Sequence, residues 1–516
     1  MQVTSRPIMK DCPIAMWGTC VKRPSLKINV ASNWAALAIS VVIGFFLTPF
    51  IVSRLGKTAY GLWTLIYSFV GYYGLLDFGV GAAVTRYIAR RTGTGDRRGM
   101  NEIAGTAMAM FCTTGALAVV LSLSVAGSLA AFFDIPAEHF PEFKHAVWIL
   151  GLAVGIGFPA SVIESAVAAH EKFVALNAVR IAGNLLRAGL ILLALTCNQG
   201  LLGISAAILL TAVLRLAMAG AVSRRYAPGV HFSMARARLS VWWELVRYGG
   251  IVTLIMLATL VQTNAATFVV GKFVGVKQVG VFGIALIIIQ YVRQFAAQAS
   301  SVLSPRFAAL DGACAHAEVE SLLLRATSNC ALLAFGLGAI VTIIAPEFVR
   351  VWVGPDFAEA VPILRILLAG HILCLSQGPG VGLLYAVKKH QYYAIAMSLQ
   401  AAAALVLGVL LAPKYGSVGV AFGTTAALLL GGLFEMVYIP MIAQIPIWRY
   451  LKRFGAPMIV GIALVLVAGL LGALDASERQ LFPSLILKAA LVTLVYGAFS
   501  LLVPESLSRS LLFGRG

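Results

Sequence analysis

Apolar residues along this 516-residue chain occur in runs of about 20, separated by short polar segments. A helix of about 20 residues crosses a hydrocarbon core of roughly 30 Å. Inside that core a segment must satisfy its own backbone polar groups, and a helix does so. Runs such as Met458–Leu471 do not alternate between polar and apolar residues, as the strands of a membrane β-barrel would. The pattern therefore predicts an all-α integral membrane protein.

The runs predict about 14 transmembrane helices. Their expected bounds are 29–53, 59–84, 103–131, 144–169, 174–196, 201–223, 246–271, 279–304, 324–346, 358–386, 391–412, 416–441, 454–474 and 484–503. Pro159, Pro379 and Pro440 fall within or beside these spans. Because proline removes a backbone hydrogen bond, each is expected to kink or end its helix.

Two stretches of the chain share one pattern of residues. The paired positions, 219 or 220 residues apart, are Gly56 and Gly275, Gly61 and Gly280, and Arg86 and Arg306. The glycines are expected in outer-loop turns and the arginines at the inner face. Spans 1–6 and 7–12 are each even in number, so both copies cross the membrane in the same direction. This predicts two parallel-repeat six-helix lobes, related by a pseudo-twofold axis along the membrane normal, plus two C-terminal helices.

The repeat divides the chain into five parts. They are a cytoplasmic tail at 1–28, an N-lobe at 29–226, a cytoplasmic linker at 227–245, a C-lobe at 246–443, and the last two spans with a C-terminal tail at 444–516. Near the end of the linker, Trp242 and Trp243 stand among charged residues. That mixture suits a helix lying at the membrane interface. The start of the seventh span explains it equally well.

Composition and charge agree with a membrane protein. The chain is 60% hydrophobic and 11% charged, which excludes a soluble globule. Its net charge of +19 does not predict nucleic-acid binding, because 26 of the 39 Lys and Arg lie in inner loops, span ends and tails and nine on the outer side. This distribution predicts that both termini are cytoplasmic. The seven cysteines show no metal-ligand spacing, so no metal or other cofactor is expected.

The first 90 residues carry a family resemblance. It rests on the segments 33–56, 60–63, 72–81 and 86–89. They resemble the opening of the Wzx-type flippases, the lipid-linked oligosaccharide exporters of the multidrug/oligosaccharidyl-lipid/polysaccharide (MOP) superfamily. The resemblance implies a non-enzymatic protein of the bacterial inner membrane that moves an undecaprenyl-diphosphate-linked oligosaccharide to the periplasmic leaflet by alternating access. It also implies that the protein acts together with a polysaccharide polymerase and export machinery in the synthesis of O-antigen or exopolysaccharide.

Four arginines lie well inside predicted spans. They are Arg187, Arg215, Arg293 and Arg365. An arginine at the centre of a span costs about 2.5–3.5 kcal/mol even on insertion scales, so each is expected to face a cavity or a partner. Lining a cavity, they would bind pyrophosphate or an acidic sugar, because guanidinium matches phosphate oxygens. Alternatively, they pair with acidic residues or extend to the head groups.

Three acidic residues are available inside the spans. Asp77 is a partner for an arginine, a coupling-ion site, or a helix-breaking residue beside Gly79 and Gly81. Glu164, five residues after Pro159, is a candidate for ion coupling or charge pairing, as is Glu435. The four arginines exceed these acids by one, which favours an anionic ligand.

Three alternatives remain open. A drug or cation antiporter of the same superfamily would need an excess of acidic residues in its cavity, which the sequence does not show. A membrane-embedded polymerase or glycosyltransferase would need a large loop outside the membrane or a carboxylate cluster. A lipid II exporter fits the same span count. The chain contains no GxxxxGK[ST] motif, so we do not expect it to hydrolyse ATP.

Overall fold

The computed structural model describes residues 26–472, apart from 302, 314, 388 and 390, together with Lys488 and Ala490. The described elements are all helical, which confirms the predicted all-α fold class. Eight helical segments of this part are long and apolar enough to cross a membrane. Ser32–Gly93 and Gln391–Ile442 each hold two of the predicted spans. The last predicted span, 484–503, lies almost entirely outside the described residues.

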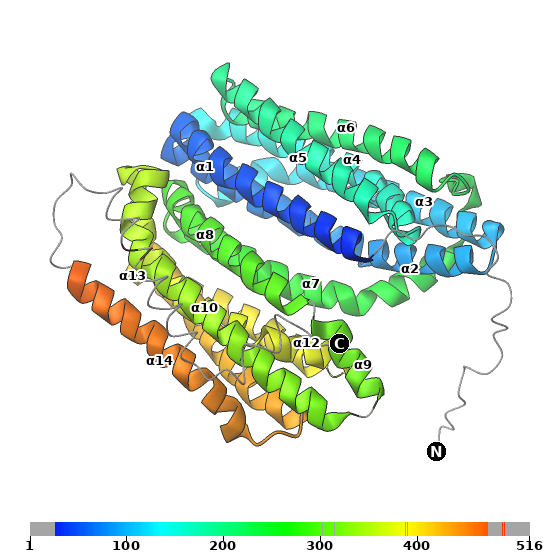
Figure 1. The fold of residues 1–516 in the computed structure, drawn as a ribbon. Helices are drawn as coiled ribbons and strands as arrows, with labels where there is room; N and C mark the ends of the chain where they lie inside the picture. The colour runs from blue at the N-terminus through cyan, green and yellow to red at the C-terminus, as the bar shows by residue number, and fades with distance from the viewer. Residues whose placement is uncertain are drawn as a thin grey trace.

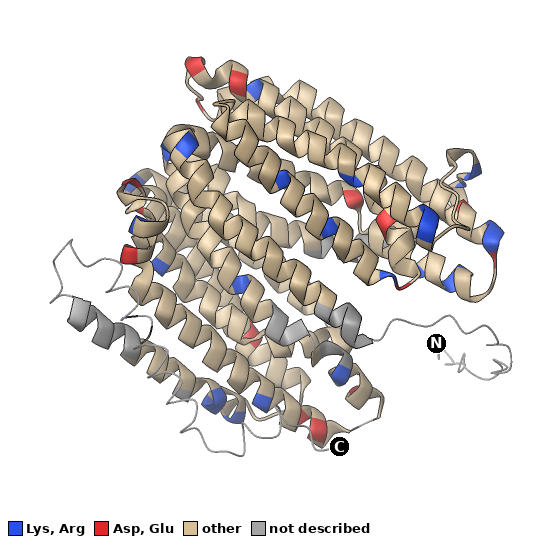
Figure 2. Cartoon of the chain, turned by 45° about the horizontal axis from the view of Figure 1, so that its top comes forward, with Lys and Arg blue, Asp and Glu red and all other residues tan. Residues whose placement is uncertain are grey.

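The helices form two groups joined by α7 (Figure 1). The first group is α1 (Leu26–Gly71), η1 (Tyr72–Asp77), α2 (Val80–Gly93), α3 (Arg97–Phe132), η2 (Ala137–His139), α4 (Phe140–Ala169), α5 (Phe173–Thr196) and α6 (Gly200–Tyr226). The connection is η3 (Met234–Arg236) and α7 (Leu239–Phe273). The second group is α8 (Val276–Ser301), α9 (Leu303–Gly312), α10 (His316–Trp352), η4 (Pro355–Phe357), α11 (Ala360–Ser376), α12 (Gly378–Ala386), α13 (Gln391–Ile442) and α14 (Ile447–Gly472). Charged residues gather toward the ends of the helices, with few in between (Figure 2).

Glycines with positive φ separate consecutive spans. Gly56 (φ +72°) breaks α1 and Gly416 (φ +57°) breaks α13. Gly275 (φ +108°) stands between α7 and α8. Residues with a Cβ rarely adopt this region of φ, so glycine suits each turn. The turns predicted at Gly56 and Gly275 are confirmed.

Gly61 and Gly280 are not turn residues, and that prediction was wrong. Both lie inside helices, where α1 packs against α8 across the boundary between the two groups. A Cβ on Gly61 would lie 2.1 Å from the backbone oxygen of Val276, and one on Gly280 would lie 2.8 Å from that of Lys57. Both copies of the repeat therefore have glycine at a position where two helix backbones pack closely. A side chain at this position would prevent that packing.

Among the described residues, the hydrophobic core is shared by both groups at one end. One cluster contains residues of both, including Leu62 of α1, Val147 of α4, Phe282 of α8 and Leu364 of α11. Beyond it are two separate clusters. The first lies among η1, α2, α3, α4 and the start of α7, and the second among α9, α10, α12, α13 and α14. The two lobes are therefore packed together at the Gly61–Gly280 end and have cores of their own at the other end.

Polar contacts cross between the lobes at the packed end. The Trp352 indole N–H donates to the Phe45 backbone oxygen at 2.9 Å. The Lys57 ammonium lies 3.8 Å from an Asp356 carboxylate oxygen. Such contacts must break if the lobes separate at this end.

The linker between the lobes is fastened to α3. The backbone N–H of His231 donates to Asn101 Oδ1 at 2.7 Å, and that of Arg238 donates to Thr106 Oγ1 at 3.0 Å. Helix α7 then begins at Leu239, so the tryptophans of the predicted linker belong to the start of the seventh-span helix. Leu245 of this helix is buried in the N-lobe core.

Among the described residues, two predicted spans show an interruption. The second changes to a 3₁₀ turn at Tyr72–Asp77, and its last part is α2. The tenth bends by 43° between α11 and α12, beside Pro379. Pro440 lies two residues before the end of α13, whereas α4 continues through Pro159. The prediction that proline kinks or ends its helix is therefore confirmed for Pro379 and Pro440. Pro159 does not end α4, and a kink at this residue stays a prediction.

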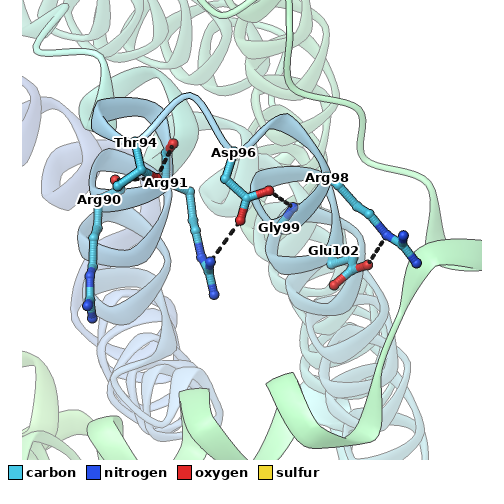
Figure 3. Close-up of polar contacts among 7 residues, drawn as sticks. All are labelled: Arg90, Arg91, Thr94, Asp96, Arg98, Gly99 and Glu102. Carbon is cyan, nitrogen blue, oxygen red and sulfur yellow. Dashed lines mark hydrogen bonds and ion pairs between the residues drawn. The ribbon is translucent and has the colours of Figure 1, made fainter. Parts of the chain in front are cut away.

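Asp96 caps α3 in the turn that follows α2 (Figure 3). Its carboxylate accepts the Gly99 backbone N–H at 2.9 Å and the Arg91 guanidinium at 2.7 Å. The Gly99 N–H, followed by the positive charge of Arg91, lowers the pKa of the Asp96 carboxyl below its usual 3.8. A side-chain oxygen at this position satisfies a backbone donor that the first turn of a helix leaves unpaired.

This lowered pKa predicts a pH dependence for the turn. The stabilisation by ionised Asp96 is complete above pH 3.8 and is lost as the pH falls through the lower folded value. Hydrogen exchange at the Gly99 amide, corrected for its intrinsic rate, should accelerate in that window. Asp96→Asn keeps the cap without titrating, so its corrected exchange rate should stay flat. An equal acid response in both proteins would contradict the prediction.

Candidate functional site

A cavity of about 480 Å³ lies in the N-lobe. Its walls come from α1, η1, α3, α4, α5 and α6, with Met256 of α7 on the side of the other lobe. The predicted residues Asp77, Arg187 and Arg215 all line it. Three of the polar residues singled out in the sequence, from three different elements, therefore meet in one cavity.

Arg215 is held by Glu164. Its Nε and Nη2 donate to the two carboxylate oxygens of Glu164, each at 2.7 Å. The Glu164 side chain is 10% exposed and that of Arg215 is 43% exposed. This two-pronged geometry is the strongest form of an arginine–carboxylate pair. Glu164 is thus a charge partner, and Arg215 is already largely neutralised.

Breaking the Arg215–Glu164 pair should destabilise the protein. Arg215→Ala would leave the Glu164 carboxylate without its partner, which costs about 3–5 kcal/mol in a fully buried pair. Because Arg215 is 43% exposed, we expect a loss of about 1–2 kcal/mol in the free energy of unfolding. Thermal unfolding in detergent would measure it. Arg215→Met combined with Glu164→Leu should unfold at a higher temperature than Arg215→Ala, and the reverse order would refute the pairing.

Arg187 lines the same cavity as Arg215 but is not held by an acidic side chain of the described chain. Its Nη2 donates to Asn184 Oδ1 at 3.4 Å, and it makes no ion pair within the described residues. It also lines a smaller cavity of about 320 Å³ between α5 and α6, with Arg180 and Arg215. An arginine in this position can bind an anion without first losing an acidic partner.

Asp77 is not paired with an arginine in the described part of the chain, so the first of its three predicted roles is wrong. Its carboxylate accepts the Gly81 backbone N–H at 3.1 Å. The next two residues, Phe78 (φ +48°) and Gly79 (φ +65°), have left-handed backbone conformations. The structure thus matches the alternative in which Asp77 stabilises a break in the second span.

A second cavity, of about 370 Å³, lies in the C-lobe. Arg293 of α8 and Glu435 of α13 line it, together with Gln262 of α7. Arg293 makes no side-chain hydrogen bond or ion pair with another residue of the described chain. Helix α7 therefore borders a cavity in each lobe, and each cavity holds an arginine without an acidic partner among the described residues.

Other polar side chains line the cavity with Arg293. Glu435 is 6% exposed, and its Oε2 has no hydrogen-bond partner among the described residues. Tyr393 and Gln400 line the same cavity, and sequence reasoning missed both. A glutamine within the otherwise apolar run 399–412 is a signal that could have identified Gln400. Tyr393 stands in a Tyr-Tyr pair at the end of a span, where aromatic residues are ordinarily interfacial.

Arg365 lies apart from these cavities. It is exposed on α11, and its Nε donates to the Thr342 backbone oxygen of α10 at 3.1 Å. It lines neither of the two lobe cavities. We therefore remove Arg365 from the predicted set of cavity cations, which leaves Arg187 and Arg293 as the charges without acidic partners in the described chain.

Solved structures of known proteins share this architecture. The lipid II flippase MurJ, in an inward closed conformation, superposes with a TM-score of 0.71 at 14% identity, over 91% of this chain and 98% of MurJ. A multidrug resistance MATE family transporter of the MOP superfamily, in an inward-facing conformation, superposes with a TM-score of 0.66 at 18% identity, over 79% of this chain and 97% of that protein. The fold is therefore that of the MOP transporters.

Two sequence matches identify the family. EpsK, an uncharacterised membrane protein of Bacillus subtilis (strain 168), is 22% identical over 489 residues, 92% of this chain and 95% of EpsK. Residues 51–362 match the family of polysaccharide biosynthesis proteins. The chain belongs to this family, and the superfamily resemblance predicted from the first 90 residues is confirmed.

Proposed function

We propose that this protein is a flippase that carries an undecaprenyl-diphosphate-linked oligosaccharide from the cytoplasmic to the periplasmic leaflet of the bacterial inner membrane. The observation that carries the proposal is Arg293, which lines the C-lobe cavity and has no acidic partner in the described chain. Arg187 lines the N-lobe cavity and likewise has no acidic partner in the described chain. Two such cations suit a diphosphate, whose oxygens accept hydrogen bonds from guanidinium.

The two-lobed packing supports alternating access. The lobes share a core at the Gly61–Gly280 end and have separate cores at the other end. Opposite rocking of the lobes would expose the cavities to each side in turn. The head group cannot cross hydrocarbon unaided, because each unpaired polar group would cost several kcal/mol. It would instead travel between the lobes while the polyprenyl chain stays in lipid.

Orientation and partners are part of the same proposal. The end at which the lobes have separate cores carries the arginine-rich turns Arg90–Arg98 and Arg224–Arg238, so the positive-inside rule makes it cytoplasmic. Both termini would then be cytoplasmic, with 29–226 and 246–443 as the lobes. A polysaccharide polymerase and export machinery would act on the product.

A second candidate is a cation antiporter, and Glu435 favours it. This buried carboxylate has an oxygen without a hydrogen-bond partner in the described chain and lies in the cavity of Arg293. It could bind a coupling ion in the flippase or a cationic substrate in an antiporter. The positive charge of Arg293 in the same cavity opposes a cationic substrate, so we assign Glu435 to coupling.

Reconstitution into liposomes separates these functions. The purified chain would be supplied with a fluorescent undecaprenyl-diphosphate oligosaccharide, with lipid II, or with a cationic dye. We expect the polyprenyl-diphosphate oligosaccharide to reach the opposite leaflet, as judged by its accessibility to a membrane-impermeant quencher. Transport of the dye alone would show that the protein is an antiporter. Transport of lipid II in preference to the oligosaccharide would show that the substrate belongs to peptidoglycan synthesis.

A further inference from the structure

A third cavity, of about 490 Å³, lies on the surface where the lobe linker crosses the start of α3. It is lined by Arg97, Arg98, Asn101, Glu102, Ala235, Arg236, Ala237 and Arg238. We call it the α3–linker cavity. None of its residues lines either of the transport cavities.

The α3–linker cavity has a large excess of positive charge. It contains four arginines and one acidic residue. Glu102 accepts the Arg98 Nε at 3.1 Å and the Arg238 Nη2 at 2.9 Å. Arg97 and Arg236 make no side-chain hydrogen bond or ion pair within the described chain. Glu102 thus positions two guanidinium groups, and the other two are available to a ligand.

The walls of the cavity are fixed by backbone contacts. Asn101 and Thr106 of α3 accept backbone N–H groups of the linker at 2.7 and 3.0 Å. At Gly105 the backbones of α3 and the linker come so close that a Cβ would lie 2.3 Å from the Ser233 backbone oxygen. A ligand would therefore meet arginines whose backbones are already in place, so binding would lose little conformational entropy.

The surroundings of the cavity are those of a membrane surface. The apolar run of α3 starts directly after Glu102, and α7 begins at Leu239. Leu239 is 73% exposed and Trp243 is 64% exposed. Exposed tryptophan and leucine beside arginines at a span end are typical of the head-group layer, where a tryptophan ring is amphipathic enough to stay.

We propose that the α3–linker cavity binds the phosphate of an anionic phospholipid head group. Arg97 and Arg236 would donate to the phosphate oxygens, while Arg98 and Arg238, held by Glu102, supply further positive charge. The position at head-group depth favours a lipid over a phosphate free in solution, since the acyl chains can remain in the bilayer beside α7. The bound lipid would join α3 to the linker that connects the lobes.

The test is lipid binding to the purified full-length chain. Native mass spectrometry would measure the apparent affinity for phosphatidylglycerol, with phosphatidylcholine as the neutral lipid and inorganic phosphate as a competitor. Arg97→Gln combined with Arg236→Gln should weaken phosphatidylglycerol binding about 25-fold, or about fivefold for each charge near the membrane surface. The matched control is Arg90→Gln with Arg224→Gln, which removes two exposed charges that do not line the cavity. We expect less than a twofold effect from it.

Each alternative result would overturn the proposal. An equal loss in both double variants would mean that overall surface charge binds the lipid. Unchanged binding in the Arg97/Arg236 variant would exclude the cavity. Displacement of phosphatidylglycerol by inorganic phosphate at equal concentration would make the ligand a soluble phosphate. Both double variants remove only exposed side chains, so a matching melting temperature would verify that each is folded.

Discussion

Replacing Arg293 with alanine should lower the transport rate of the lipid-linked substrate about 30-fold. A hydrogen bond to a charged group contributes about 1.5–3 kcal/mol, and 2 kcal/mol corresponds to this factor in rate. Arg293 makes no hydrogen bond or ion pair within the described chain, so its removal takes a partner from no described acidic residue. The measurement is the initial rate of leaflet exchange in the reconstituted liposomes.

The matched control for Arg293 is Arg365→Ala. Both are arginines within predicted spans, but Arg365 is exposed on α11 and bonded to a backbone oxygen of α10. Its loss should leave the transport rate within a factor of two. Arg293→Lys should retain part of the rate, because it keeps the charge and loses the forked donor geometry. If Arg293→Ala folds and transports at the normal rate, the cationic-cavity mechanism is wrong.

Replacing Gly61 with alanine should shift the protein away from the packed arrangement seen here. The new Cβ would lie 2.1 Å from the Val276 backbone oxygen, and backbone cannot rotate aside as a side chain can. Overpacking of this kind costs about 1–3 kcal/mol. A cost of 2 kcal/mol on one conformation changes the ratio of the two conformations about 30-fold. Distance measurements between spectroscopic labels at Lys57 and Asp356 would detect the separation of the lobes.

Gly71→Ala provides the comparison for Gly61→Ala. It is the same substitution in the same helix, but the nearest atom to its Cβ would be Asn264 Nδ2, at 3.7 Å, an ordinary contact. The label distance should therefore match that of the unsubstituted protein. A short label distance in Gly61→Ala, equal to that in Gly71→Ala, would show that the glycine contact does not control the separation of the lobes.

The helices were predictable because long apolar runs leave few alternatives in a membrane. The positive φ at Gly56 and Gly275 was also predictable, since both glycines follow the end of an apolar run. The role of Gly61 and Gly280 was not. They stand only five residues beyond those turns, and sequence spacing does not tell whether a glycine turns the chain or admits a neighbouring backbone.

The chemistry of the site was less predictable than the fold. The sequence showed that the buried arginines needed a cavity or a partner, and the structure separates these outcomes residue by residue. Arg215 has a partner, Arg293 lines a cavity, and Arg365 is exposed on α11. The rotation of each helix about its axis decides between these outcomes, and a nearly uniform apolar span such as the tenth carries little information about that rotation.

The contact between Gly61 and Gly280 also bears on the origin of the protein. These glycines occupy the same position in the two copies of the repeat, 219 residues apart. In a twofold arrangement, a residue meets its own equivalent only on the axis. A pseudo-twofold axis relating the two copies would therefore pass between them, and an ancestral half-length chain would have touched a second copy of itself at this glycine. What is now a contact within one polypeptide would then have begun as the centre of a homodimer interface.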